Sequence, residues 1–199
     1  GNSKEWQKSK SMVISVQAKA FGKGPLHAQF YFPLNSNTFQ FNGKLGKTKM
    51  SAFNDMTIHG AGIKITDGSI KEMSFDITAD NQSSHGSLEL YYDDLEVSIL
   101  KEKQEEGQTI EKERKFFNFL ANKVVLPVQN PSKKGSFYSA TVAFDRDINK
   151  RIFNYLWKSI FSGIKDTFLK GHKTESINKQ VEDGKEDNLS KKDKRRLAK

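Results

Sequence analysis

The sequence contains no cysteine, and this absence removes several kinds of chemistry at once. Disulfide bonds, thiolate metal sites and cysteine nucleophiles are all excluded. The chain also lacks any apolar run of about 18 residues, the length at which a segment becomes a candidate membrane-spanning helix. Its first ten residues, GNSKEWQKSK, have no apolar stretch of the kind that a secretory signal needs.

Apolar residues are scarce as well, since they make up only 35% of the 199 residues, although 15 of them are phenylalanine. This balance predicts a real but thin core, diluted by polar segments at both ends. We expect one domain over residues 12–170, between disordered segments at 1–11 and 171–199. The net charge of +9 favours anionic partners, such as phosphate-rich surfaces or acidic lipid headgroups, without choosing between them.

Residues 62–100 carry the clearest repeated pattern in the chain. Turn formers at Asp67 and Gly68, at 80–86, and at Asp93 and Asp94 divide this stretch into four short pieces. Within each piece, apolar residues alternate with polar ones: Ile63 and Ile65; Ile70, Met73, Phe75 and Ile77; Leu88, Leu90 and Tyr92; Leu95, Val97 and Ile99. Because the connections are too short for crossover helices, the pattern predicts four antiparallel strands that share one apolar face.

Further strands are predicted on both sides of this region, at 12–20, 26–32, 39–46 and 136–144. Residues 47–61 are interpreted as an irregular helical turn or a loop, and the spacing of Met50, Phe53 and Met56 favours the helical alternative. The fold class is therefore α+β, mainly β: a curved antiparallel meander of about seven to eight strands. Such a sheet needs a cover on its apolar face.

A long amphipathic helix is predicted from Ile148 to Leu169, with Asp147 as its N-cap. A shorter one is predicted at 116–126, after a charged loop at 101–115. The long helix can be interpreted in two ways: as the cover of the sheet, or as a segment lying in a membrane surface with cations beside its aromatic face. The predicted lipid or membrane contacts are Ile152, Phe153, Leu156, Trp157, Ile160, Phe161, Ile164, Phe168, Lys150, Arg151, Lys158 and Lys165.

No pattern in the chain indicates catalysis, a metal or a cofactor. The four histidines lack the spacing of a zinc site. Asp93, Asp94 and Glu96 form a carboxylate cluster that a turn and a polar sheet face explain. No nucleophile elbow or glycine-rich phosphate loop occurs. Residues 171–199 carry a charge of only +3, from nine basic and six acidic residues, so nucleic-acid binding is not expected either.

Several of these stretches together resemble the C-terminal region of AsmA-like envelope proteins of the Bacteroidetes type. The stretches are GIKITDGSIKEMSFDIT, then HGSLELYYDDLEVSIL with Gly86, Leu88, Leu90, Tyr92, Asp94 and Leu95 in register, the pair Asn130 and Pro131, and the aromatic helix with Trp157, Lys158 and Ser159. The resemblance covers roughly residues 40 to 170. It implies a periplasmic β-groove with an apolar lining, in a protein anchored to the inner membrane by a helix that this sequence does not contain. It also implies a part in phospholipid transport or outer-membrane homeostasis.

Two functional hypotheses from different classes remain open at this point. In the first, the apolar sheet face and the long helix handle lipid without catalysis, and the partner is phospholipid or a membrane surface. In the second, the sheet edge or the aromatic helix docks on another envelope protein and lipid plays no part. An enzyme is not expected, because no nucleophile, base and orienting group can be identified together.

Overall fold

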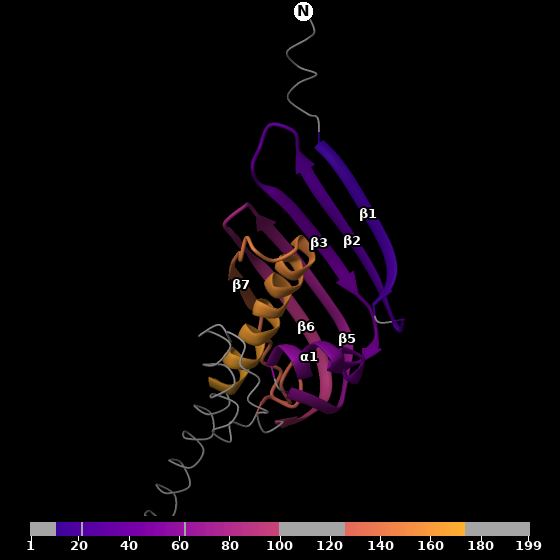
Figure 1. The fold of residues 1–199 in the computed structure, drawn as a ribbon. Coiled ribbons are helices and arrows are strands. Elements are labelled where there is room, and N and C mark those ends of the chain that lie inside the picture. The colour runs from indigo at the N-terminus through magenta and orange to yellow at the C-terminus, as the bar shows by residue number, and fades with distance from the viewer. Residues whose placement is uncertain (1–10, 21, 62, 100–125, 174–199) are drawn as a thin grey trace, which may run out of the picture.

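A seven-stranded antiparallel sheet with one long helix across it forms the body of the protein (Figure 1). The computed structural model describes residues 11–20, 22–61, 63–99 and 126–173. The strands are β1 (Ser11–Ala20), β2 (Gly24–Pro33), β3 (Phe39–Leu45), β4 (Thr48–Lys49), β5 (Ile63–Ala79), β6 (Ser83–Ile99) and β7 (Ala140–Asp145). Neighbours follow the order β1-β2-β3-β5-β6-β7, and the short β4 pairs with β5. The predicted α+β class and meander topology are confirmed.

The register places the alternate apolar residues of successive strands side by side on one face of the sheet. One such row runs from Ile14 to Phe30, Phe41 and Ile77, each paired with the next across the strands. We call this side the apolar face. The opposite side carries polar rows, for example Gln29, Asn42, Asp76 and Ser87. One face packs and the other meets water, as the alternation predicts.

The central region forms two strands of 17 residues each rather than the four short strands predicted from its turn formers. Only the connection at 80–82 is a turn. At the other two positions the ladder continues through register irregularities between Ile65 and Glu72. Gly68 and Asp94 take up the distortion there with positive φ angles of 132° and 55°. A β-bulge accommodates an extra residue and bends the strand without ending it, which is why these turn-type residues were misinterpreted.

Between β4 and β5 the chain forms a 3₁₀ turn, η1 (Met50–Phe53), followed by the helix α1 (Asn54–Ala61). The helical interpretation of this segment was therefore the right one. Asn54 fastens it to the sheet: its amide nitrogen donates to the Ile65 carbonyl at 3.0 Å, and its amide oxygen accepts from the Ile65 N–H at 2.7 Å. The side chain thus pairs with β5 as a neighbouring strand would, and it holds η1 and α1 at the lower end of the sheet (Figure 1).

Asn130 extends the edge of the sheet beyond β7. It is fully buried, and its main chain exchanges hydrogen bonds with Tyr92 on β6. Its side chain donates to the carbonyls of Leu90 and Tyr138 and accepts from the Tyr138 N–H, at 2.7 to 3.1 Å. Because Asn130 engages the backbone of Tyr138, the strand predicted at 136–144 begins only at Ala140.

The long helix spans residues 152–173, whereas the sequence predicted 148–169. Asp147 does accept a bond from a main-chain amide, that of Asn149 at 2.9 Å, but the turn that it closes lies before the helix. The helix runs past the predicted end at Leu169, and Gly171 lies buried within it against Pro127 and Tyr138. The predicted disorder at 1–11 and 171–199 was wrong at Ser11, which begins β1, and at 171–173, which belong to the helix. The rest of both segments, the loop at 101–115 and all but the last residue of the short helix at 116–126 lie outside the described residues.

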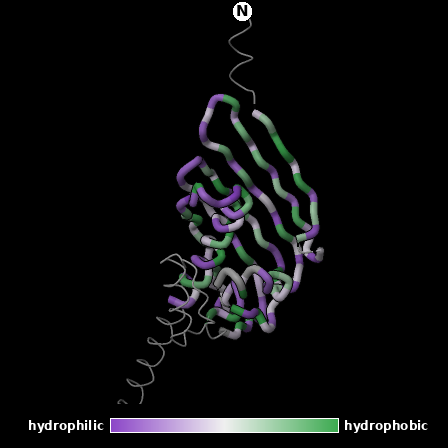
Figure 2. Tube along the Cα trace, in the orientation of Figure 1, coloured by the Kyte–Doolittle hydropathy of each residue, from purple (hydrophilic) through white to green (hydrophobic). Residues whose placement is uncertain are grey.

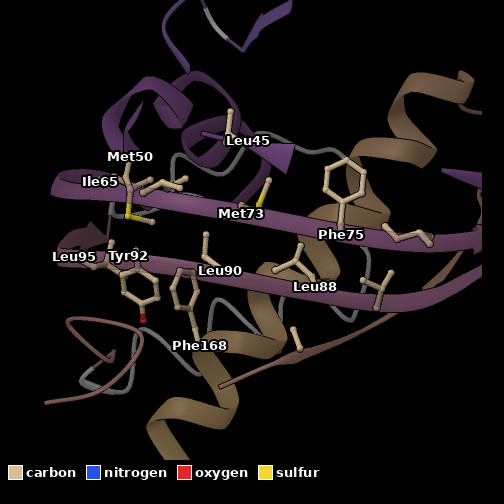
Figure 3. Packing of buried hydrophobic residues seen from close by; sticks show 14 of the residues in the cluster. Leu45, Met50, Ile65, Met73, Phe75, Leu88, Leu90, Tyr92, Leu95 and Phe168 are labelled. Atoms are coloured by element: carbon tan, nitrogen blue, oxygen red, sulfur yellow. The ribbon is translucent and has the colours of Figure 1, made fainter. Parts of the chain in front are cut away.

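The core lies between the 152–173 helix and the apolar face of β3, β5, β6 and β7. Figure 3 shows Phe168 reaching from the helix toward Tyr92 on β6, while Met50 of η1 lies beside Ile65 on β5. The Phe168 and Tyr92 rings meet edge to face at 5.6 Å. The helix therefore covers the sheet, which is the first of the two interpretations given above.

Candidate apolar binding site

The 152–173 helix rests on the sheet through a line of mostly small residues. Tyr155, Ser159, Gly163 and Thr167 recur at every fourth position, and all four are buried. A Cβ atom on Gly163 would come within 2.9 Å of the Leu88 side chain, so only glycine permits this approach. We call these four residues the helix seat.

Two of the three hydroxyl groups of the helix seat, those of Ser159 and Thr167, are satisfied inside the core, whereas the buried Tyr155 hydroxyl makes no hydrogen bond within the described residues. The Ser159 hydroxyl lies 2.7 Å from that of Ser84 on β6 and donates to the Tyr155 carbonyl at 2.8 Å. The Thr167 hydroxyl donates to the Gly163 carbonyl at 3.2 Å. Burial of hydroxyl groups is inexpensive when each finds a partner, so a polar seat can support a close helix-to-sheet contact.

Because mostly small residues take the contact with the sheet, two large aromatic residues of the helix, Trp157 and Phe161, stand to one side of it. The rings of Trp157 and Phe161 stack with their centroids 5.7 Å apart. The Lys165 ammonium lies 5.3 Å from the centroid of Phe161, within the range of a cation–π contact. This side of the helix faces η1 and α1 across a hollow.

The hollow is bounded by three elements: the helix, the segment formed by η1 and α1, and the floor made by β5 and β6. The space within it that the centre of a water molecule can occupy is about 60 Å³, and all the space between its lining atoms, open mouth included, is about 690 Å³. Its lining is apolar apart from Thr57 and Lys165, and consists of Met50, Phe53, Thr57, Ile63, Ile65, Ile70, Met73, Leu90, Leu95, Val97, Leu126, Trp157, Phe161, Ile164, Lys165 and Phe168. An apolar concavity with few polar groups is the usual form of a site for an apolar ligand.

The apolar face continues past the helix onto β1 and β2, where no other described element covers it (Figures 1 and 2). Four phenylalanines of β2 and β3 form a stacked group at the border between the core and this open part, with ring centroids 5.3 to 6.5 Å apart: Phe30, Phe32, Phe39 and Phe41, of which Phe41 is buried. Beyond them, Met12 and Ile14 on β1 remain 51% and 44% exposed. The hollow and this open surface lie on the same face of one sheet.

The structure brings five of the twelve predicted contact residues to the hollow. They are Trp157, Phe161, Ile164, Lys165 and Phe168, and of these Phe168 is buried in the core. Two more, Leu156 and Ile160, pack partly buried against the core. Seven of the predicted residues therefore lie along the body of the helix on the side of the sheet or of the hollow.

The remaining five predicted residues include a separate exposed group at the start of the helix. Phe153 is 79% exposed and Ile152 is 42% exposed, and the neighbouring Ile148 reaches 75%. Lys150 and Arg151 are exposed between them, just before the helix begins. Lys158 is half-buried one turn further along. Apolar tips with adjacent cations are thus concentrated at residues 148–153.

Part of this site was missed by sequence reasoning. The helix seat was overlooked because large apolar residues were taken as the buried stripe, and a repeat of small residues every fourth position was the signal that would have found it. The opposite wall was also missed. It is built by Met50, Phe53 and Thr57, in a segment whose helical spacing of apolar residues was noticed but not connected to the long helix.

Three titratable groups among the described residues, Asp80, Tyr155 and Asp93, have contacts or surroundings that indicate a structural role. The main-chain amides of Ser83 and Gln82 hold the pKa of the Asp80 carboxyl below its ordinary value of 3.8. Burial raises the pKa of the Tyr155 phenol above 10.0. Asp93, a member of the predicted carboxylate cluster, forms an ion pair with Lys71 at 2.7 Å.

Within the described ranges, no three acidic or histidine side chains converge as metal ligands would. In the same part of the chain, no helix is both long and apolar enough to cross a membrane. Comparison of the chain with protein-family models, with curated proteins and with solved structures finds no match.

Proposed function

We propose that this protein is a non-enzymatic, lipid-handling module whose apolar hollow and open sheet face shelter acyl chains. The observation that carries the proposal is the hollow between the 152–173 helix and η1, because its lining is apolar except for Thr57 and Lys165. As part of the same proposal we place the protein in an AsmA-like family, on the periplasmic side of the cell envelope, with phospholipid or a membrane surface as its partner.

Partition of hydrocarbon out of water supplies the driving force, so no catalytic residue is needed. Each methylene group that leaves water contributes about 0.8 kcal/mol. The centre of a water molecule can occupy only about 60 Å³ of the hollow, so it has room for the end of a chain only. The remainder of an acyl chain would lie along the apolar face toward the phenylalanine group on β2 and β3.

The start of the long helix is suited to touch a membrane surface. Ile148, Ile152 and Phe153 project into solvent, with Lys150 and Arg151 beside them. Apolar side chains that enter the acyl boundary, next to cations that meet acidic headgroups, are the two components of interfacial binding. The net charge of +9 acts in the same direction.

Quenching of Trp157 by lipid with brominated acyl chains tests the hollow directly. The chain has two tryptophans, so a Trp6→Phe variant leaves Trp157 as its single indole reporter. We expect brominated phosphatidylglycerol to quench Trp157 strongly, because its ring lines the hollow.

The matched control carries its reporter on the opposite face of the sheet. In a Trp6→Phe, Trp157→Phe background, Phe137→Trp places an indole where Phe137 now stacks on Tyr91, at 4.6 Å between centroids. That reporter should be quenched far less than Trp157. Equal quenching of the two reporters, or no quenching of Trp157, would refute the proposal.

Flotation with anionic vesicles tests the surface contact separately. The double change Ile148→Asp and Phe153→Asp should abolish co-flotation, because it puts charge where apolar groups would have to enter the bilayer. The control, Val128→Asp, alters an apolar residue that is also exposed, at 46%, and that lies in the segment before β7. Flotation that is unchanged in the double variant would contradict membrane docking through residues 148–153.

A further inference from the structure

Strand β1 forms an edge of the sheet without the features that usually protect one. Among the described residues no strand pairs with its outer side, while all ten of its residues pair with β2 in unbroken register. It contains no proline, and its only charged residue is Lys19, near the end of the strand. Natural proteins normally blunt such an edge with charge, proline, a bulge or a cover.

The side chains of β1 are exposed to solvent along most of the strand. Only Val16 and Ala20 are half-buried, and the other eight residues are exposed. Met12 and Ile14 lie on the apolar face beside the phenylalanine group, while Val13 is exposed on the polar side. Both the backbone and the apolar surface therefore stop abruptly at β1, which indicates that another strand continues them.

We propose that β1 pairs antiparallel with β1 of a second copy of this chain, about a two-fold axis through Ser15. An axis perpendicular to the sheet keeps both apolar faces on the same side. Ile14 then lies opposite Val16 of the partner subunit, and Met12 opposite Ala18 of the partner subunit.

Charge favours a second copy as the occupant of this edge. In the proposed register Lys19 lies opposite Ser11 of the partner subunit, so no two like charges face each other. A strand that pairs with this edge must be extended, free of bulges and apolar at alternate positions. Strand β1 of a second copy has all three properties.

The long helix leaves room for this association. It lies over β5, β6 and β7, away from β1 (Figure 1). In the dimer, β1, β2 and β3 of both copies would lie between the two helices. The two β3 strands, five strand spacings apart, would be separated by about 24 Å at ~4.8 Å per spacing. The helices would then flank one apolar floor built from the β1 and β2 strands of both copies.

Sedimentation of the full chain over a wide range of concentration tests the association. We expect a reversible dimer. Ser15→Lys should raise the dissociation constant at least tenfold, because it sets two cations face to face at the axis. The control Gln29→Lys places the same charge on the same face of β2, one strand away from the edge, and should leave the dimer intact.

The lack of cysteine permits a second, independent test. Opposed Cβ atoms in antiparallel pairs lie about 4.5 to 5.5 Å apart, so Ser15→Cys should form an intersubunit disulfide under mild oxidation. The control Asn42→Cys lies in the same row of the sheet, on β3, and should not crosslink. A wild-type chain that is monomeric at every concentration, or a Ser15→Cys variant that crosslinks no faster than the control, overturns the proposal.

Discussion

Replacement of Asn130 by alanine should be among the most damaging single changes in this protein. The side chain is fully buried and makes three hydrogen bonds: to the Leu90 carbonyl at 2.7 Å, to the Tyr138 carbonyl at 3.1 Å and from the Tyr138 N–H at 2.9 Å. Alanine removes all three and leaves those main-chain groups without this partner, in a place that water does not reach.

The expected cost follows from the number of bonds. Three hydrogen bonds at about 1 kcal/mol net each give about 3 kcal/mol, and the buried groups left unpaired raise the total to about 3 to 5 kcal/mol. A loss of this size is a large fraction of the roughly 5 to 15 kcal/mol that a domain possesses. Asn130→Asp should be comparably harmful, because it keeps the shape but loses both donors and buries a carboxylate.

Urea unfolding followed by circular dichroism measures this loss as a shift of the midpoint at constant slope. Gln129→Ala is the control, since its side chain makes a single part-buried bond to the Pro131 carbonyl at 3.1 Å and should cost about 1 kcal/mol or less. If Asn130→Ala unfolds within about 1 kcal/mol of the wild type, the segment beside β6 is not held by this side chain and the reasoning fails.

Three further outcomes are expected. Gly163→Ala should destabilise the fold by about 1 to 3 kcal/mol despite its better helix propensity, because the new methyl group meets Leu88 at 2.9 Å and Val142 at 3.0 Å; thermal melting would reveal a neutral change if the seat were loose. Since the folded-state pKa of Asp80 is lowered, the stability that it contributes is present at neutral pH and is lost as pH falls below about 4. In unfolding measured as a function of pH, Asp80→Asn should lose less stability than the wild type as pH falls below about 4. An equal loss in the two proteins would contradict this role of Asp80. Tyr155, whose pKa is raised, contributes stability that is lost only as pH rises above 10.0, so Tyr155→Phe should be less sensitive to alkali than the wild type in the same measurement.

The strands were predictable where alternation alone decides the structure. The strands that begin at Ser11, Gly24 and Phe39 match the predicted ranges to within two residues, because side-chain period and turn residues point to the same boundaries there. The long hairpin was not predictable in detail, since Asp67, Gly68 and Asp94 have the same preference for a positive φ angle or a tight bend in a turn as in a bulge. Only the pairing partner across the sheet distinguishes the two cases.

The candidate site depended on tertiary information to a greater extent. The amphipathic helix was evident from spacing, but its first turn was misplaced because Asp147 closes a separate turn before it. Which side of the helix meets the sheet could not be read from apolar residues alone, since they cover more than one side and Gly163 marks the closest contact. Met50 and Phe53 are brought opposite the helix only by the tertiary fold, so their place in the wall of the hollow could not be predicted from spacing in the sequence.

The helix seat has a consequence for how this protein can vary. The contact that stabilises the fold goes through Ser159, Gly163 and Thr167, whereas the rings that border the hollow, Trp157 and Phe161, point elsewhere. Volume can therefore be added or removed on the ring side without disturbing the seat. The size of the hollow can thus change while the scaffold stays the same, so the two sides of one helix can evolve at different rates.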